Sequence, residues 1–436
     1  MKQVVKSDLA QRPPMGWNSW DCFGVNVTEA EVRQNAEFIA KHLKDYGWEY
    51  VVVDLGWYAP TATRHNYKEP KIPMIIDEYG RLLPVEERFP SAQGGRGFKP
   101  LADYIHSLGL KFGIHIMRGI PWIAAEQDTP VLGTAKSAAQ IANPEDMCLW
   151  YNSMYGVDTT QSTGQAYYDS LLALYVSWGV DFIKADDLGF WDGDGLISPY
   201  RVDEVEALSS AVANCGRDIV LSLSPGAAYI GDAFHLRRHA HLWRISCDFW
   251  DDWEALKRQF SRCARWANRI TPGHWPDADM LPLGKIGIRG EIGEARQTHF
   301  TINEQYTLMT LWCIFRSPLM FGGHLPESDD LAIQLITNEE VLAVNQASEQ
   351  NRELFRDDRV CIWAASAQGS SAQYAALFNL SEEDSVDIEL DLSLMGIHGK
   401  VKVKDLWEKE VLGTFTDRIS QPVPKHGAIL LKLSQD

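Results

Sequence analysis

Short runs of β-branched and apolar residues that end in a polar residue recur before about residue 345, and they constrain the fold more than any other feature. YVVVD at 50–54, KFGIHI at 111–116 and DFIKAD at 181–186 are three such runs. Longer amphipathic stretches separate them, as at 28–47 (TEAEVRQNAEFIAKHLKDYG). This alternation indicates parallel β/α units.

The series continues along the chain until it is long enough to close a barrel. Further runs are DIVLSLS at 218–224, LWRIS at 242–246 and SPLMFG at 317–322, and strands near MGW at 15–17 and near Trp275 bring the total to eight. Eight such units are typical of a (β/α)8 TIM barrel. We therefore predict an α/β catalytic barrel over residues 1–345.

The pattern changes after about residue 345 to short alternating segments separated by Gly, Ser, Asp and Pro. They read RVCIWAAS, AQYAALFNL, VDIELDL, KVKVKDLW and AILLKL. This alternation predicts a C-terminal antiparallel β-sandwich domain at 346–436. A chain of 436 residues is long enough for two cores. Because no low-complexity linker separates the two parts, we expect them to pack directly against each other.

Composition excludes several classes of partner. The formal net charge of −18 repels phosphate backbones, and we find no basic run that would offset it, so nucleic acid is not an expected partner. There is no apolar run long enough for a membrane span. The N-terminal residues MKQVVKSDLAQRPP are too polar for a signal peptide, and the 7 cysteines are scattered without a CxxC pair. We expect a cytoplasmic protein with free thiols.

Acidic residues gather where the predicted strands end, which is the end of a barrel that carries active sites. Asp54 ends the second strand, Asp186 and Asp187 end the fourth, and Asp248 follows the sixth. Glycoside hydrolysis uses two carboxylates that face each other across a pocket: one attacks the anomeric carbon, and the other protonates the leaving oxygen. Any one of these aspartates taken alone is more often a helix N-cap. Acids at several strand ends together favour catalysis.

The neighbours of two of these acids indicate their roles. Lys184 stands two residues before Asp186 on the same side of the strand, so we expect it to lower the pKa of Asp186 and keep that nucleophile ionised. Phe249 and Trp250 follow Asp248, and we expect their bulk to desolvate this acid and raise its pKa.

These same segments carry a family resemblance that runs nearly end to end. They are PPMGWNSWDCFG at 13–24, YVVVDLGWY at 50–58, GLKFGIHI at 109–116, DFIKADD at 181–187, WRISCDFWDDW at 243–253, GHWPDADML at 273–281 and SPLMFGGHL at 317–325. The chain resembles glycoside hydrolase family 27, whose best-known members are α-galactosidases and α-N-acetylgalactosaminidases. The resemblance implies a retaining exo-glycosidase, in the first place an α-galactosidase, on a barrel with a C-terminal β-sandwich.

The resemblance also assigns roles to residues of this chain. It implies that Asp186 is the nucleophile and Asp248 the acid/base, which agrees with the reading of the strand ends. It places Trp20 as an apolar wall, Asp54 toward the C4 and C6 hydroxyls, Lys184 on the O3 to O4 side and Arg244 near O2. The remaining expected sugar contacts are Trp57, His115, Ser224, Trp275 and Asp277.

Several departures from the family pattern bear on which sugar binds. The second strand of typical α-galactosidases ends in two aspartates, whereas here it reads Asp54-Leu55, so one acceptor for the galactose hydroxyls is missing. The loop at 223–227 is built of small residues, which leaves room for an acetamido group. His115 stands where Tyr is usual, and Ala185 replaces an aromatic residue. An α-N-acetylgalactosaminidase or a related exo-glycosidase of the family is therefore an alternative.

Other functional classes have weaker support. The candidate metal ligands His115, His274 and His324 lack metal-binding spacing, and the glycine-rich segment at 92–100 has no strand immediately before it. We therefore expect that the protein holds neither a metal nor a cofactor. We expect its partner to be a small-molecule or oligosaccharide substrate, and a homo-oligomer is possible. A sugar-binding barrel without catalysis is the alternative from a different class, and Asp186→Asn would separate the two.

Overall fold

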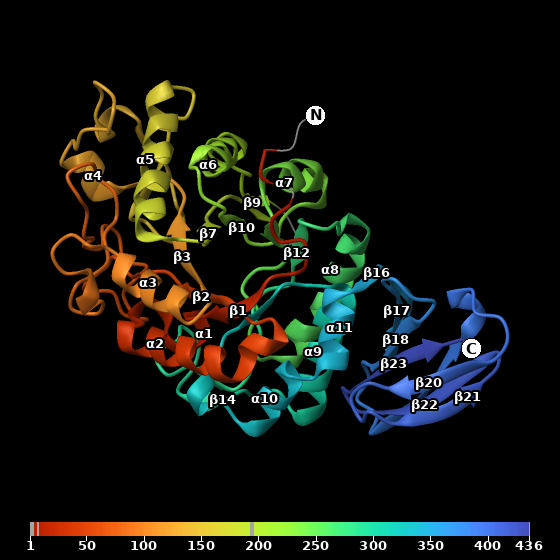
Figure 1. The fold of residues 1–436 in the computed structure, drawn as a ribbon. Helices are drawn as coiled ribbons and strands as arrows, with labels where there is room; N and C mark the ends of the chain where they lie inside the picture. The colour runs from red at the N-terminus through yellow and green to blue at the C-terminus, as the bar shows by residue number, and fades with distance from the viewer. Residues whose placement is uncertain (1–3, 7, 192–195, 436) are drawn as a thin grey trace.

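The computed structural model describes residues 4–6, 8–191 and 196–435. Its centre is an eight-stranded parallel sheet in the order β12-β11-β10-β7-β3-β2-β1-β15 (Figure 1). The strands are β1 (Met15–Asn18), β2 (Tyr50–Val53), β3 (Lys111–Met117), β7 (Phe182–Asp186), β10 (Val220–Ser224), β11 (Leu242–Arg244), β12 (Trp275–Asp277) and β15 (Leu319–Phe321). A parallel bridge between Leu281 and Phe321 joins the segment after β12 to β15. The predicted barrel architecture is confirmed.

The strands form where the sequence offers residues that suit a sheet covered on both faces. All four residues of β2 are buried, and Val51, Val52 and Val53 are 0% exposed. Strands β1 and β2 approach so closely that a Cβ at Gly16 would lie 2.5 Å from the Tyr50 carbonyl oxygen. A glycine is therefore required at this point of the barrel.

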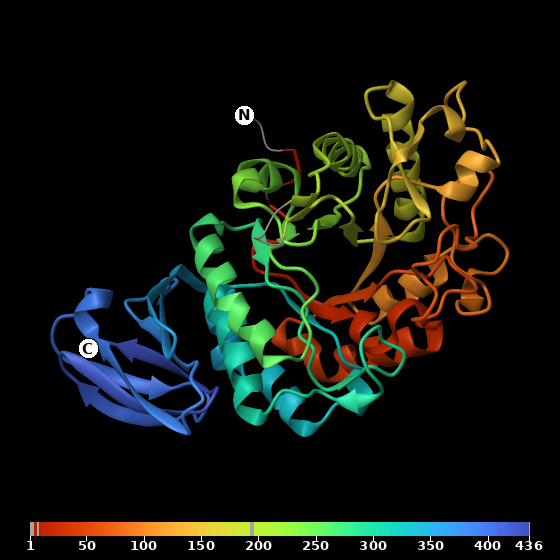
Figure 2. The same ribbon diagram turned by 180° about the vertical axis from the view of Figure 1, so that it is seen from behind.

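Helices surround the sheet, as the two opposite views in Figures 1 and 2 show. They are α1 (Trp20–Phe23), α2 (Glu29–Phe38), α3 (Lys99–Ser107), α4 (Trp122–Glu126), α5 (Ser162–Trp178), α6 (Val202–Asn214), α7 (Ala233–His239), α8 (Trp253–Trp266), α9 (Ile302–Phe315), α10 (Asp330–Ile336) and α11 (Glu339–Gln346). Thr28 and Glu31 form a capping box at the start of α2. Every helix in the described ranges is too short or too polar to cross a membrane.

Three small antiparallel sheets extend from the connections that follow barrel strands. They are β4 (Ile120–Pro121) with β5 (Ala142–Met147) and β6 (Met154–Val157), β8 (Phe190–Trp191) with β9 (Leu196–Ser198), and β13 (Lys285–Ile286) with β14 (Arg296–Gln297). Each comes after the carboxyl end of a barrel strand, namely β3, β7 and β12. These insertions lie at the barrel end where active sites form.

The C-terminal domain is antiparallel. A six-stranded sheet in the order β16-β17-β18-β23-β20-β21 lies beside the pair β19-β22. The strands are β16 (Ser348–Arg356), β17 (Val360–Ala367), β18 (Gln373–Asn379), β19 (Ser385–Asp391), β20 (Val401–Asp405), β21 (Val411–Phe415), β22 (Arg418–Pro424) and β23 (Ala428–Ser434). Leu377 and Leu431 of the larger sheet share a core with Ile388 and Ile419 of the pair. The predicted β-sandwich is confirmed.

The two domains pack directly against each other along α9, which Figures 1 and 2 place between the barrel and the C-terminal sheets. Thr307 Oγ1 donates to the His426 carbonyl at 2.6 Å, and Trp407 Nε1 donates to Thr310 Oγ1 at 2.9 Å. Because α9 faces the barrel on one side and the sandwich on the other, nearly all of its side chains are buried.

Candidate active site

A cavity of about 360 Å³ opens at the carboxyl ends of the barrel strands. Its lining contains both predicted catalytic acids and most of the predicted sugar contacts. These residues are Trp20, Asp54, His115, Lys184, Asp186, Ser224, Arg244 and Asp248. They come from six different strands and the turns that follow them, so the barrel itself brings together residues far apart in the sequence.

Asp186 is the last residue of β7 and is held by two hydrogen bonds. Its Oδ2 lies 3.1 Å from His115 Nε2, and its Oδ1 accepts from the Asp187 N–H at 2.6 Å. The Arg118 N–H donates to the Asp186 carbonyl at 3.0 Å. The side chain keeps 20% of its surface exposed. One oxygen is thus oriented by the buried His115 of β3, and the carboxylate still reaches the cavity.

Lys184 forms its direct ion pair with Asp54. Its Nζ lies 2.9 Å from Asp54 Oδ2, which also accepts from Asn18 Nδ2 at 2.7 Å. The other Asp54 oxygen accepts from the Leu55 N–H at 2.8 Å. Burial acts to raise the pKa of Asp54, but Lys184 and His115 outweigh it and hold this pKa well below the ordinary value. Asp54 and Lys184 therefore form a buried pair of fixed charge at the cavity wall.

Arg244, the last residue of β11, connects Asp248 to a second acid. Its Nη2 lies 3.1 Å from Asp248 Oδ1 and 2.9 Å from Asp279 Oδ2. The side chain of Asp248 is 60% exposed, whereas Phe249 is buried in the core against Trp312. The expectation that the aromatic neighbours Phe249 and Trp250 desolvate Asp248 is therefore wrong, because most of the Asp248 side chain stays exposed to solvent.

Asp279 is a cavity residue that the sequence analysis did not select. It lies two residues beyond β12 and has a φ of 87°, a conformation that non-glycine residues rarely adopt. Its Oδ2 also accepts from the Phe249 N–H at 2.7 Å. Burial raises the pKa of Asp279, and Arg244 opposes that shift. The strand-end rule that found Asp186 and Asp54 would have found Asp279 too.

Asp187, next to the predicted nucleophile, belongs to a buried ionic network. Arg118 Nε lies 2.8 Å from Asp187 Oδ2, and Arg118 Nη1 lies 2.7 Å from Glu204 Oε1. Burial raises the pKa of Asp187 to about 6, although Arg118 acts in the opposite direction. This network fixes the turn after β7 and thereby the position of Asp186.

Three predicted sugar contacts do not line the cavity. Trp57 is 0% exposed and donates through Nε1 to the His115 carbonyl at 2.8 Å. Trp275 is also 0% exposed, and its Nε1 donates to the Ala10 carbonyl at 2.7 Å. Asp277 is buried beside Arg244 and accepts from the Asp279 N–H at 2.9 Å. Trp57 thus supports His115 and Asp277 supports Asp279 from behind the cavity, whereas Trp275 binds the N-terminal segment.

The outer part of the cavity is built from insertions and loops. Tyr67 packs edge-on to Trp20 with 5.8 Å between ring centroids, and its hydroxyl lies 2.7 Å from Glu291 Oε1. Leu149 and Trp150, between β5 and β6, complete this rim. No periodic pattern marks loop residues of this kind, which explains why the sequence analysis missed them.

The arrangement suits chemistry on a sugar ring. Two carboxylates from different strands face one cavity, a fixed charge pair can bind hydroxyls, and Trp20 offers an apolar surface. These are the parts that glycoside hydrolysis requires. Asp252, a further acid after β11, is by contrast a helix N-cap: its side chain accepts from the Ala255 N–H of α8 at 2.8 Å.

Comparison with known proteins gives the family. The profile described as alpha galactosidase A matches residues 12–125 and 133–347. The profile of the alpha galactosidase C-terminal beta sandwich domain matches residues 357–433. This chain belongs to glycoside hydrolase family 27. The resemblance inferred from the motifs is thereby confirmed, and this family 27 protein is a glycoside hydrolase.

Individual family 27 relatives differ in their named activities. The chain is 26% identical to alpha-galactosidase 2 of Arabidopsis thaliana, over 100% of this chain and 92% of the relative. It is 48% identical to a β-L-arabinopyranosidase of Geobacillus stearothermophilus solved in complex with arabinose, with a TM-score of 0.95 over 99% of each chain. It is 47% identical to a putative α-N-acetylgalactosaminidase of Bacillus halodurans, with a TM-score of 0.87 over 97% of each chain.

Proposed function

We propose that this family 27 enzyme is a retaining exo-glycosidase that releases L-arabinopyranose from terminal β-L-arabinopyranosides. The observation that carries the proposal is the side chain of Leu55, which is 2% exposed and lines the cavity directly beside Asp54. The 48% identity to a β-L-arabinopyranosidase supports it, since the α-galactosidase relative of Arabidopsis thaliana is 26% identical.

The chemistry of the two sugars explains why Leu55 matters. L-arabinopyranose has the ring and hydroxyl configuration of D-galactopyranose but lacks the hydroxymethyl group at C5, and a β-L-arabinopyranoside has the anomeric geometry of an α-D-galactoside. Galactose therefore brings one more hydroxyl into the site. A buried hydroxyl without a partner is unfavourable by about 1 to 3 kcal/mol, and Leu55 offers no acceptor. The Asp54 and Lys184 pair remains for the hydroxyls that both sugars share.

The proposed mechanism is a double displacement with Asp186 and Asp248 as its catalytic residues. The Asp186 carboxylate, oriented by His115 and the Asp187 N–H, attacks the anomeric carbon while Asp248 gives its proton to the departing oxygen. Asp248 then takes a proton from water, which attacks the glycosyl-enzyme and restores the starting configuration. Because Asp248 is exposed, both the leaving group and the incoming water can reach the same carboxyl group.

Two other substrates remain candidates within the family. The named activity of the curated relatives, with the Asp54 and Lys184 pair in place, favours α-galactosides as the second substrate class. Ser224, Pro225 and Gly226 line the cavity, and these small side chains would admit an acetamido group.

The experiment is to measure kcat/KM for four p-nitrophenyl glycosides with the wild type and Asp186→Asn side by side. The panel contains the β-L-arabinopyranoside, α-galactoside, α-N-acetylgalactosaminide and α-glucoside. The proposal requires that the arabinopyranoside is the best substrate and that Asp186→Asn removes the activity. A higher kcat/KM for the α-galactoside would overturn the substrate, and full activity in the variant would overturn the mechanism.

We also propose that the enzyme works in the cytoplasm. All 7 cysteines are free thiols in the structure, which suits a reducing compartment. Fractionation of producing cells, followed by immunodetection, checks this: recovery with the envelope or medium would contradict it.

A further inference from the structure

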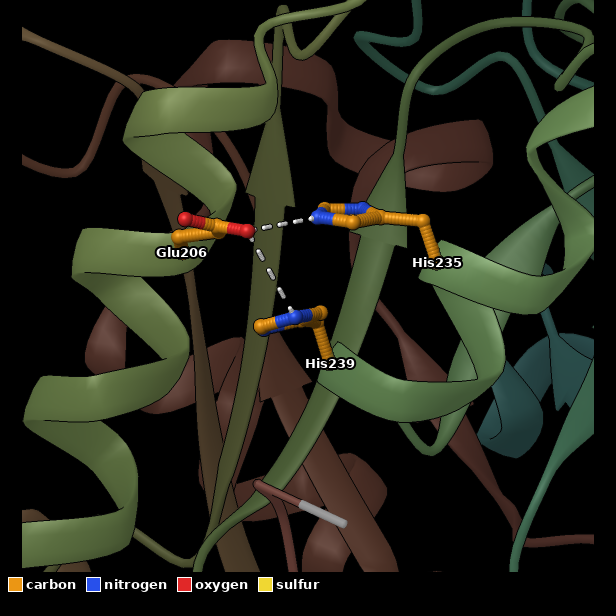
Figure 3. A group of neighbouring side chains, drawn as sticks. All are labelled: Glu206, His235 and His239. Carbon is orange, nitrogen blue, oxygen red and sulfur yellow. Dashed lines mark hydrogen bonds and ion pairs between the residues drawn. The ribbon is translucent and has the colours of Figure 1, made fainter. Parts of the chain in front are cut away.

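Outside the catalytic cavity, Glu206 of α6 and His235 and His239 of α7 point toward one another (Figure 3). One ligand atom from each side chain lies within 4.8 Å of the others. Glu206 Oε1 is 3.3 Å from His235 Nε2 and 4.0 Å from His239 Nε2. Within residues 4–6, 8–191 and 196–435, these three side chains are the one group of histidine, cysteine and carboxylate residues whose ligand atoms lie close enough together to hold a metal ion.

The helix places the two imidazoles in register. His235 and His239 stand four residues apart in the segment HLRRH, so they lie on the same face of α7. Their rings stack with 4.3 Å between centroids and 23° between planes. Figure 3 shows both rings directed from α7 toward the Glu206 carboxylate on the neighbouring helix. Two histidines at this spacing are a common bidentate unit for a metal ion.

Hydrogen bonds prepare His239 as a ligand. Ser209 Oγ donates to the Glu206 carbonyl at 3.1 Å, so it accepts from His239 Nδ1–H, 2.7 Å away. This places the proton on Nδ1 and leaves a lone pair on Nε2. His239 is 3% exposed, and among the described residues its Nε2 has no hydrogen-bond partner. A buried acceptor without a donor is unfavourable, and an ion between the helices would satisfy it.

Hydrogen bonds also hold His235. Its Nδ1 lies 2.9 Å from the Tyr200 hydroxyl, and its Nε2 lies 3.3 Å from Glu206 Oε1. A metal ion would replace the proton between Nε2 and Glu206, and the Tyr200 hydroxyl would then accept a hydrogen bond from Nδ1–H.

We propose that Glu206, His235 and His239 bind one divalent transition-metal ion, with Zn²⁺ as the best fit. Zinc–nitrogen bonds of about 2.0 to 2.1 Å place tetrahedral ligand atoms about 3.3 Å apart. The Glu206 to His235 distance of 3.3 Å already matches this value, and a small rotation of His239 brings its Nε2 from 4.0 Å to the same distance. Two imidazoles and a carboxylate suit zinc, and water takes the fourth position.

The bound ion links two barrel helices, because Glu206 belongs to α6 and both histidines belong to α7. Helices α6 and α7 flank β10 in the chain, and Ser224 of β10 lines the catalytic cavity. All three ligands lie outside the cavity lining. The ion therefore stabilises the fold without taking part in glycoside hydrolysis, and its removal leaves kcat/KM for a p-nitrophenyl glycoside unchanged below the unfolding temperature.

The test uses the full chain without a histidine tag, treated with EDTA and dialysed. Isothermal titration calorimetry with ZnCl₂ measures stoichiometry and affinity, and thermal unfolding with and without Zn²⁺ measures the change in Tm. We expect one Zn²⁺ per chain and a Tm that rises by a few degrees. Co²⁺ in place of Zn²⁺ should give the visible absorption of a tetrahedral site.

Variants assign the binding to these residues. Glu206→Gln and His239→Gln should each weaken Zn²⁺ binding by roughly tenfold or more. The matched control His398→Gln, at an exposed histidine of the C-terminal domain, should bind as the wild type does. The Glu206 side chain is 51% exposed, so Glu206→Gln gives a folded variant even where His239→Gln does not. Absence of stoichiometric binding by the wild type, or equal binding by wild type and Glu206→Gln, overturns the proposal.

Discussion

His115 Nε2 lies 3.1 Å from Asp186 Oδ2, so a histidine on β3 orients the proposed nucleophile at the end of β7. From the sequence, Lys184 was expected to keep Asp186 ionised through its charge, because it stands two residues before Asp186 on the same strand. Lys184 instead pairs with Asp54 across the barrel. The histidine that replaces the family's usual tyrosine has therefore become part of the nucleophile's support.

Removing this hydrogen bond should slow the chemical step. A hydrogen bond to a charged group contributes about 1.5 to 3 kcal/mol, so we expect His115→Phe to lower kcat by roughly 10- to 100-fold with a smaller effect on KM. His115→Gln keeps a donor and should retain more of the activity. Michaelis–Menten kinetics with the best p-nitrophenyl substrate checks this, and an unchanged kcat in His115→Phe would show that the contact is structural.

The role assigned to Asp248 predicts a dependence on the leaving group. A general acid matters most when the departing oxygen is strongly basic. Asp248→Asn should therefore lower kcat/KM far more for an alkyl glycoside than for a dinitrophenyl glycoside of the same sugar. Sodium azide should restore turnover of the activated substrate. Equal losses on both substrates would argue for a binding role instead.

The lack of a hydrogen-bond acceptor on Leu55 predicts the effect of placing an acidic side chain at position 55. Leu55→Asp supplies an acceptor for the extra galactose hydroxyl, so the ratio of kcat/KM for the α-galactoside to that for the β-L-arabinopyranoside should rise roughly tenfold or more. Leu55→Asn is the uncharged control, and it should shift the ratio in the same direction by less. A ratio that stays constant in both variants would place the selectivity elsewhere, with the small residues at 224–226 as the next candidates.

The charge state of Asp54 predicts a pH dependence of stability. Its pKa in the folded protein lies below the ordinary value of 3.8, so the stabilisation from its charge is present above that value and is lost as pH falls below it. Breaking a buried pair is unfavourable by about 3 to 5 kcal/mol, and Asp54→Asn leaves Lys184 without its partner.

Denaturant unfolding of the wild type and Asp54→Asn at several pH values measures this effect. The difference in the free energy of unfolding should be constant between pH 8 and pH 5 and should narrow below about pH 4. A difference that changes between pH 5 and pH 8 would mean that Asp54 titrates there, and so would contradict the low pKa.

The barrel and its strand-end acids could be predicted because they follow from local patterns. Buried runs such as Tyr50–Val53 have a fixed period, and the barrel geometry dictates that Asp54 and Asp186 end up at one face. Partner choice across the barrel could not be predicted in this way. Whether Lys184 bonds Asp186 or Asp54 depends on the register between strands, which the sequence of one strand does not contain.

The sequence also could not predict which of these side chains are buried in the core and which face the cavity. Trp57 and Trp275 carry the family motifs but face the core, and Asp248 stays exposed although aromatic residues follow it. The rim residues Tyr67 and Glu291 come from loops 224 positions apart. Such contacts arise from tertiary packing, so a motif identifies the neighbourhood of the site but not the direction of each side chain.

The central claim is that Asp186 forms a covalent glycosyl-enzyme. It is tested most directly by inactivating the wild type with 2-deoxy-2-fluoro-β-L-arabinopyranosyl fluoride, digesting the protein and sequencing the labelled peptide by mass spectrometry. We predict a single added fluorosugar on Asp186. A label on another carboxylate, or turnover without a trapped intermediate and with release of the inverted anomer, would contradict the account.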